Sequence, residues 1–125
     1  MNVVDSSAWL ACFSKEPGFE FFVQVIQDTQ FLIVPTVCLC EVFRVFLREY
    51  DETTALEATA TMRQGTLVEL DAELALDAAL LGHQNKLSLA DSIIYATARR
   101  YQAELWTRDA HFKDLPGVRY QPKEV

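Results

Sequence analysis

Short apolar runs alternate with helix-like segments along almost the whole chain, and this alternation restricts the fold more than any other feature of the sequence. Runs that predict buried strands lie at residues 2–4, 31–34, 67–70 and 104–107, and a fifth candidate lies at 118–120. Segments typical of helices separate these runs. This order favours an α/β fold with a mostly parallel sheet of four to five strands flanked by helices.

Residues that favour the first turn of a helix stand at the start of several of these segments. We expect helices over about 8–13, 19–26, 36–50, 71–82 and 88–100, and a further helix that opens near residue 54. The expected N-caps are Ser6 or Ser7, Thr36, Asp71 and Ser88, and Thr54 with Glu57 resembles a capping box.

The length and composition predict one domain over residues 1–125. Half of the 125 residues are hydrophobic and 23% are charged, which is enough apolar material for a packed core. The net charge of -7 comes from 18 acidic and 11 basic residues. This balance disfavours a polybasic nucleic-acid binder, which needs an excess of Lys and Arg. It is compatible with an enzyme whose acidic residues surround metal ions.

The sequence carries no signal for secretion or for a membrane span. Cys12, Cys38 and Cys40 lack the spacing of a disulfide scaffold, and we expect Cys38 and Cys40 to be core residues. No basic segment precedes an apolar stretch at the N-terminus, and the most apolar region, 31–45, is too short and too interrupted to cross a bilayer. We therefore expect a cytoplasmic protein.

Three of four candidate acidic residues lie at or near the predicted sheet edge at which α/β proteins bind ligands, outside the carboxyl ends of the strands. Asp5 ends the first strand, Asp109 follows the fourth strand, and Glu41 lies in the second turn of the helix after the second strand. Asp91 lies in the first turn of the helix before the fourth strand, so its placement depends on the topology. A purely structural role is open for each, since Asp residues often cap turns and helices.

Glu41 is the hardest of these residues to explain structurally. Apolar residues surround it on nearly all sides of the predicted helix. A carboxylate buried there must be paired, protonated or bound to a cation, because burying it alone is very costly. Arg44 and Arg48 share its helix face and are either its ion-pair partners or contacts for an anionic substrate.

Four segments, in order and in register, carry a resemblance to a known family. They are Val3–Ser7 (VVDSS), the helix that contains Glu41, Leu89–Ala98 (LADSIIYATA) and Leu105–Phe112 (LWTRDAHF). Together they resemble a PIN-domain ribonuclease, in the small single-domain form of the VapC toxins of prokaryotic toxin–antitoxin systems. The resemblance covers the whole chain and implies a single PIN domain over 1–125, a three-layer sandwich around a mostly parallel sheet.

The resemblance also implies a chemistry. Asp5, Glu41, Asp91 and Asp109 would gather at one edge, hold Mg²⁺ or Mn²⁺ and act in the hydrolysis of RNA phosphodiester bonds. Hard divalent cations prefer such oxygen ligands. The small hydroxyl residues that the family places near the site correspond to Ser7 and Thr107, and the basic candidates for phosphate contacts are Arg44, Arg48, Arg108 and Lys113. The implied partners are RNA, a cognate antitoxin and a second copy of the chain, with no membrane.

Two functional alternatives remain beside a toxin. A housekeeping PIN nuclease in RNA maturation would use the same site. A non-catalytic regulatory or binding module, such as a receiver domain, would need adjacent acids after the first strand and a late lysine, and the sequence places Asp5-Ser6-Ser7 there instead.

Two smaller features also bear on partners and substrate. His111 follows Asp109 closely, and it is either a substrate contact or an exposed turn residue. Phe21 and Phe22 are adjacent and cannot both face inward on one helix, which predicts exposed apolar surface of the kind that partners use.

Overall fold

The computed structural model describes residues 1–123, which form five strands, six α-helices and two short 3₁₀ helices. The strands are β1 (Asn2–Val4), β2 (Leu32–Pro35), β3 (Thr66–Val68), β4 (Glu104–Thr107) and β5 (Val118–Tyr120). The α-helices are α1 (Ser6–Phe13), α2 (Glu20–Gln27), α3 (Thr36–Glu49), α4 (Glu52–Met62), α5 (Ala72–Asn85) and α6 (Leu89–Arg100). The 3₁₀ helices are η1 (Thr29–Phe31) and η2 (Ala110–Phe112).

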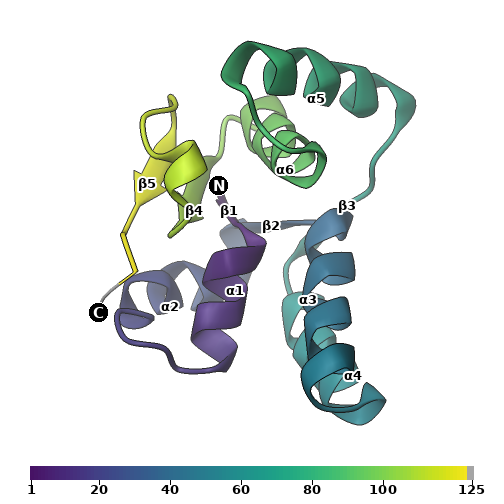
Figure 1. Ribbon diagram of the computed structural model, residues 1–125, viewed down its shortest axis with the longest axis vertical. Coiled ribbons are helices and arrows are strands. Elements are labelled where there is room, and N and C mark those ends of the chain that lie inside the picture. Colours follow the sequence, from purple (N-terminus) through teal and green to yellow (C-terminus); the bar gives the residue numbers. More distant parts are fainter. Residues whose placement is uncertain (124–125) are drawn as a thin grey trace.

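The five strands form one sheet in the order β3-β2-β1-β4-β5, and every neighbouring pair is parallel. The helices α1 and α2 lie on one side of this sheet and α5 and α6 on the other, while α3 and α4 form a hairpin beside α1 (Figure 1). This arrangement confirms the predicted α/β sandwich with a parallel sheet. All five predicted strands are present, and those at 2–4, 104–107 and 118–120 have the predicted bounds.

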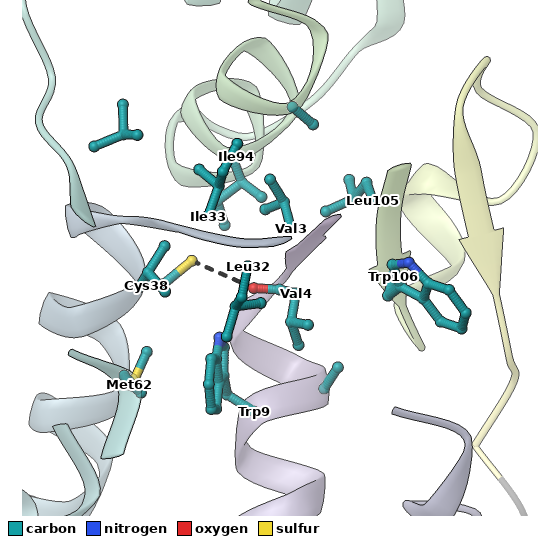
Figure 2. Packing of buried hydrophobic residues seen from close by; sticks show 14 of the residues in the cluster. Val3, Val4, Trp9, Leu32, Ile33, Cys38, Met62, Ile94, Leu105 and Trp106 are labelled. Atoms are coloured by element: carbon teal, nitrogen blue, oxygen red, sulfur yellow. Dashed lines mark hydrogen bonds between the residues drawn. The ribbon is translucent and has the colours of Figure 1, made fainter. Parts of the chain in front are cut away.

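The central strand β1 divides the core into two layers, because successive side chains of a strand point to opposite faces. Val3 lies with Ile94 of α6 on one face, and Val4 lies with Leu32 and Trp9 on the other (Figure 2). All five side chains are at most 1% exposed. With both faces covered, β1 is held rigidly in the middle of the molecule, and so is the residue that follows it.

Several helices begin at residues other than the expected N-caps. Asp5, and not Ser6 or Ser7, caps α1, because it is the one extended residue between β1 and α1, and its carboxylate accepts a hydrogen bond from the Ala8 N–H. Thr36 is the first residue of α3, and Pro35, still paired in β2, occupies the cap position.

The capping box expected at Thr54 and Glu57 is also absent. The helix α4 starts at Glu52 after an extended Asp51, whose carboxylate accepts from the Thr54 N–H at 2.7 Å. The caps at Asp71 and Ser88 are as predicted. The helix after Asp71 continues past Gly82 to Asn85 and ends where Lys86 adopts a left-handed conformation.

The hairpin of α5 and α6 sets the direction of α6 across the sheet. Asp71, the N-cap of α5, accepts two hydrogen bonds from Arg100 at the end of α6, so the two helices run antiparallel. They approach closely at Gly82, where an added Cβ would lie 2.0 Å from the Ser92 hydroxyl. The first turn of α6, with Asp91, therefore lies at the carboxyl edge of the sheet, beside the residues that follow β1 and β4.

Exposed apolar side chains lie mainly on the helices rather than at the expected phenylalanine pair. Phe22 is fully buried, and Phe21 is half-buried, because it packs against Phe22 and the Trp106 ring. The most exposed apolar side chains on α5 are those of Leu76 and Leu80. Within the described part of the chain, every helix is too short or too polar to span a bilayer.

Of the two cysteines expected in the core, only Cys38 is buried, with its thiol directed to the Val4 carbonyl at 3.9 Å (Figure 2). The expectation for Cys40 is wrong, because residues two apart on a helix point to different faces, and this side chain is exposed. All three cysteines are free thiols, in agreement with the absence of a disulfide framework from the sequence.

Candidate active site

Asp5 lies at the junction of β1 and α1 and is only 2% exposed. Its two carboxylate oxygens accept hydrogen bonds from three groups: the Ala8 N–H at 3.1 Å, the Ser7 hydroxyl at 2.9 and 3.0 Å, and the Thr107 hydroxyl at 2.8 Å. Every one of these donors is neutral. The side chain is thus fixed in position by hydrogen bonds, while its charge is not balanced by them.

Burial has the largest effect on the pKa of the Asp5 carboxyl. Removal from water raises the pKa of this carboxyl from 3.8 to about 7, against the lowering effect of hydrogen bonds from Thr107, Ala8 and Ser7. The nearby Asp109 carboxylate raises the pKa further. A buried acid with a pKa near neutrality is common at functional sites, and a bound cation would reverse the shift.

Thr107 connects Asp5 to the second acidic residue, Asp109. The buried Thr107 hydroxyl donates to Asp5 and accepts the Asp109 N–H at 2.9 Å. The Asp109 carboxylate then accepts the His111 N–H at 2.9 Å and so opens η2. One threonine therefore fixes both the side chain of Asp5 and the backbone of Asp109.

Asp91 lies beside Asp5 and Asp109 but comes from the first turn of α6, the helix on the other face of the sheet. Its side chain is 17% exposed. Burial raises the pKa of Asp91 most, and the neighbouring Asp109 and Glu41 carboxylates raise it further. The Asp91 N–H is satisfied by the Ser88 hydroxyl, so the backbone of this residue is capped while its carboxylate faces other acids.

Glu41 completes the group from the second turn of α3. It is half-buried, and its Oε1 accepts a hydrogen bond from the Ser6 hydroxyl at 2.7 Å. Arg44 and Arg48, the partners considered from the sequence, lie elsewhere: Arg48 pairs with Glu49, and Arg44 lines a separate groove between α3 and α4. The sequence suggested Ser6 only as a helix cap and not as a site residue, although its place beside Asp5 was a usable signal.

All four carboxylates line one cavity of about 230 Å³. They come from four separate segments of the chain, and the cavity is also lined by Ser6, Ser7, Leu10, Val45 and Ile94. A cavity of about 380 Å³ lies at the opposite edge of the sheet, but its Asp71 carboxylate is already bonded to Arg100. The smaller cavity is therefore the better candidate for a cation site.

Within residues 1–123, no Lys or Arg side chain forms an ion pair with any of these four carboxylates. Four neighbouring carboxylates repel one another, so the cluster favours either protonation or a cation. The donors are oxygen atoms in a small, partly buried cavity, which is the chemistry that Mg²⁺ and Mn²⁺ prefer. The residues present thus fit a hard divalent cation.

His111 is a neighbour of this cluster that the sequence did not assign to a metal. Its Nδ1 lies 3.1 Å from Asp109 Oδ1 and 3.9 Å from Asp91 Oδ2. One ligand atom from each of these three residues lies within 4.8 Å of the other two. The available signal was its spacing, two residues after Asp109 in a short turn.

The remaining basic candidates do not line the cavity. Arg108 is 7% exposed and is held by Glu16 at 3.0 Å and by the Pro17 carbonyl at 3.2 Å. Lys113 lies over the Tyr120 ring at 5.9 Å. Arg108 therefore serves to tie the loop after α1 to the end of β4 and is not free to contact phosphate in this conformation.

A family model described as the PIN domain matches residues 3–118, which is most of the chain. The chain belongs to the PIN domain family. No curated protein sequence matches this PIN domain.

Several solved structures are similar to this PIN domain. A toxin–antitoxin complex from Klebsiella pneumoniae is 23% identical, with a TM-score of 0.81 and 100% of both chains covered. VapC20 from Mycobacterium tuberculosis, described as a sarcin–ricin loop cleaving toxin, is 16% identical, with a TM-score of 0.76 over 98% of this chain and 100% of that one. DNA-bound VapBC from Salmonella typhimurium is 12% identical, with a TM-score of 0.77 over 97% and 96%. At these identities the likeness shows a common fold.

Proposed function

We propose that this PIN domain is a divalent-metal-dependent endoribonuclease that acts as the toxin of a toxin–antitoxin pair. The observation that carries the proposal is the convergence of Asp5, Glu41, Asp91 and Asp109 on one cavity with no Lys or Arg paired to them among residues 1–123. A structural cluster of acids would be expected to recruit basic partners, as Asp71 recruits Arg100.

The four carboxylates are the residues that would hold Mg²⁺ or Mn²⁺. When bound, such a cation polarises a phosphoryl oxygen and offsets the negative charge of the phosphodiester. Asp5 and Asp109 are the most direct ligands in this proposal, and Asp91 supports them from α6. Because Thr107 bonds to both Asp5 and Asp109, it fixes the spacing of these two residues before any substrate arrives.

Besides its place among the four carboxylates that would hold the cation, Glu41 has a second role in the proposed reaction. The Ser6 hydroxyl donates to one of its carboxylate oxygens, Oε1, and Glu41 lines the cavity. A carboxylate in that position orients the attacking water and accepts its proton. The water would add to phosphorus as Glu41 takes its proton, and the bond to the leaving oxygen would break. The leaving oxygen would depart with a proton from solvent, and no covalent protein intermediate forms.

The toxin assignment is supported by the kind of protein that shares this fold. Several similar structures are complexes of the VapBC or FitAB kind, and the Klebsiella pneumoniae structure is a toxin–antitoxin complex. We extend this to a cognate antitoxin, a homodimer and a cytoplasmic location for the present chain. Co-expression with an open reading frame directly upstream should relieve growth arrest if the assignment is right.

The test is cleavage of a panel of structured RNAs, including a sarcin–ricin loop, with Mg²⁺ or Mn²⁺ and with a chelator. The wild-type chain should cut at least one RNA, and the chelator should abolish cutting. Asp91→Asn should cut at least ~100-fold more slowly, since changes even in the residues that support a metal ligand cost ~10–100-fold. Asp77→Asn, an exposed acid on α5, is the matched control and should be unaffected.

Cleavage that persists in the chelator, or an unchanged rate for Asp91→Asn, would contradict the metal-dependent mechanism. Binding of RNA with no cleavage under any metal would favour a non-catalytic binding module on the same fold.

A further inference from the structure

We infer that the His111 imidazole is a nitrogen ligand of the cation held at the acidic cluster, and that it gives this site a preference for a first-row transition cation such as Mn²⁺ over Mg²⁺. The inference rests on the proposed function, because it refines the metal site of that nuclease. It concerns a residue outside the four acidic positions.

The first support is the placement of the imidazole. Asp109 Oδ1 accepts the His111 N–H at 2.9 Å, which closes the turn at the start of η2 and bends residue 111 back toward the carboxylate. The imidazole Nδ1 then lies 3.1 Å from Asp109 Oδ1 and 3.9 Å from Asp91 Oδ2. Asp91 comes from α6, whereas His111 lies in η2 and Asp109 is the N-cap of η2.

The second support is the spacing of the donor atoms. Oxygen and nitrogen ligands bind Mn²⁺-sized or smaller ions at roughly 2.0–2.2 Å, so two donors on one octahedral ion lie about 3 Å apart when adjacent and about 4 Å apart when opposite. The two distances from His111 Nδ1, 3.1 and 3.9 Å, fall in this range. One ligand atom from each of the three residues lies within 4.8 Å of the other two, close to the spacing that a shared ion requires.

The third support is the environment of the ring. The side chain of His111 is 77% exposed, so its Nε2–H can bond to water while Nδ1 faces the acids. A simple ion pair with Asp109 would need no second carboxylate. Here Nδ1 lies close to two carboxylates, those of Asp109 and Asp91.

The expected preference follows from ligand chemistry. Mg²⁺ is a hard ion that favours oxygen and holds its waters firmly, whereas imidazole suits transition metals. A nitrogen donor therefore adds affinity for Mn²⁺ and almost none for Mg²⁺. A site made only of carboxylates would have more similar affinities for Mn²⁺ and Mg²⁺.

The experiment uses the full chain, with the metal alone as the probe. Pulsed electron paramagnetic resonance of bound Mn²⁺ detects a directly coordinated nitrogen, and calorimetry gives the affinities for Mn²⁺ and Mg²⁺. The variants are His111→Gln and, as the matched control, His83→Gln, which changes the only other histidine, an exposed residue of α5. Wild type labelled with ¹⁵N-imidazole tests the same point without any substitution.

The wild-type protein should show nitrogen coupling to Mn²⁺, and the coupling should change with the ¹⁵N label. His111→Gln should abolish the coupling and weaken Mn²⁺ binding at least ~10-fold, with Mg²⁺ binding within about twofold. His83→Gln should behave as wild type.

Bound Mn²⁺ without nitrogen coupling, or equal Mn²⁺ affinity in His111→Gln, would overturn the inference and leave the nuclease proposal standing. Absence of both Mn²⁺ and Mg²⁺ binding in the wild type would overturn the proposed function together with it.

Discussion

Asp5 and Asp71 have the same local role but lie in opposite electrostatic surroundings. Each is the extended residue before a helix, and each accepts a backbone N–H from the first turn, Ala8 for Asp5 and Leu74 for Asp71. The exposed Asp71 is bonded to Arg100, and its pKa lies below the usual value, first because of that hydrogen bond. The buried Asp5 has only neutral donors, and burial raises its pKa to about 7.

The contrast extends to the two edges of the sheet. At the amino edge, acidic residues are paired with arginines, as in Asp71 with Arg100 and Glu104 with Arg119. At the carboxyl edge, four carboxylates share one cavity and, in the described chain, no arginine or lysine pairs with them. A helix cap alone explains Asp71. It does not explain why Asp5 is buried among other acids, which costs stability unless a cation is bound.

The largest expected effect is on RNA cleavage, and it differs between the two N-cap residues, Asp5 and Asp71. Asp5→Asn should reduce metal-dependent RNA cleavage at least ~100-fold, because it removes a ligand and not merely a supporting contact. Asp71→Asn should leave cleavage within about twofold, since it only weakens a cap and an exposed pair. Both rates are measured on the same RNA at saturating metal, after circular dichroism has shown that both variants are folded. Equal losses in the two variants would remove the distinction between the edges.

The pH dependence of stability should differ in sign between the two residues. The pKa of the Asp5 carboxyl rises from its ordinary value of 3.8 to about 7 on folding, so the folded state keeps a proton that the unfolded state releases between these values. The free energy of unfolding in a chelator should therefore fall as the pH rises from about 4 to 7, by on the order of a few kcal/mol. The pKa of Asp71 is lowered in the folded state, so its effect on stability has the opposite sign. The stability that this residue contributes is lost as the pH falls through its pKa in the folded protein.

Urea unfolding from pH 4 to 8, with the wild type compared with Asp5→Asn, measures this effect. The variant should be the more stable protein at pH 8, and the difference should shrink toward pH 4. A wild-type advantage at pH 8 in the chelator would contradict the account of Asp5 as a buried charge.

The α5–α6 hairpin links the two edges, and Gly82 is its most sensitive point. Gly82→Ala places a methyl group against the Ser92 hydroxyl and Cβ, which forces the start of α6 away from α5. We expect a loss of about 1–3 kcal/mol in the free energy of unfolding, as for other overpacked sites, and weaker metal binding because Asp91 moves. The double variant with Ser92→Gly should recover most of both losses. If the double variant recovers neither stability nor metal binding, the contact between residues 82 and 92 is not the cause of the losses.

The smallest expected effect concerns the hydroxyl that joins Asp5 to Asp109. Thr107→Val keeps the shape of the side chain and removes both of its hydrogen bonds. At pH 8 we expect a loss of about 1–2 kcal/mol in the free energy of unfolding and a further rise of the Asp5 pKa, because this bond lowers it. Thr107→Ser should be close to wild type. A Thr107→Val variant with unchanged stability and metal affinity would mean that Thr107 only fills space.

The sequence was sufficient for the strands, the parallel sheet and three of the acidic positions. Strands 2–4 and 104–107 are apolar runs with clear ends, and Asp5 and Asp109 follow them closely. Because parallel α/β sheets bind ligands outside the carboxyl ends of their strands, these two residues could be predicted to lie at the site. The position of Asp91 was not derivable, because two helices lie between β3 and β4. In the structure α6 ends just before the amino end of β4, so its first turn, with Asp91, lies at the carboxyl edge beside Asp5 and Asp109.

The errors in the local predictions have a common cause. Ser6 and Thr54 are good caps by composition, but the cap is decided by which residue is extended where the helix begins, and these are Asp5 and Asp51. Arg108 also looked available for phosphate, and a contact 92 residues away with Glu16 holds it instead. Pairings between distant residues decide such cases, and a local pattern does not contain them.

The most direct test of a shared cation at the carboxyl edge is a crystal structure of the wild-type chain soaked in Mn²⁺, with anomalous scattering used to locate the ion. We predict a manganese peak within coordination distance of Asp5, Asp91 and Asp109, and none at the Asp71–Arg100 pair. Crystals that bind manganese elsewhere, or in which the four carboxylates stay unliganded at saturating Mn²⁺ and pH 8, would contradict a shared cation site.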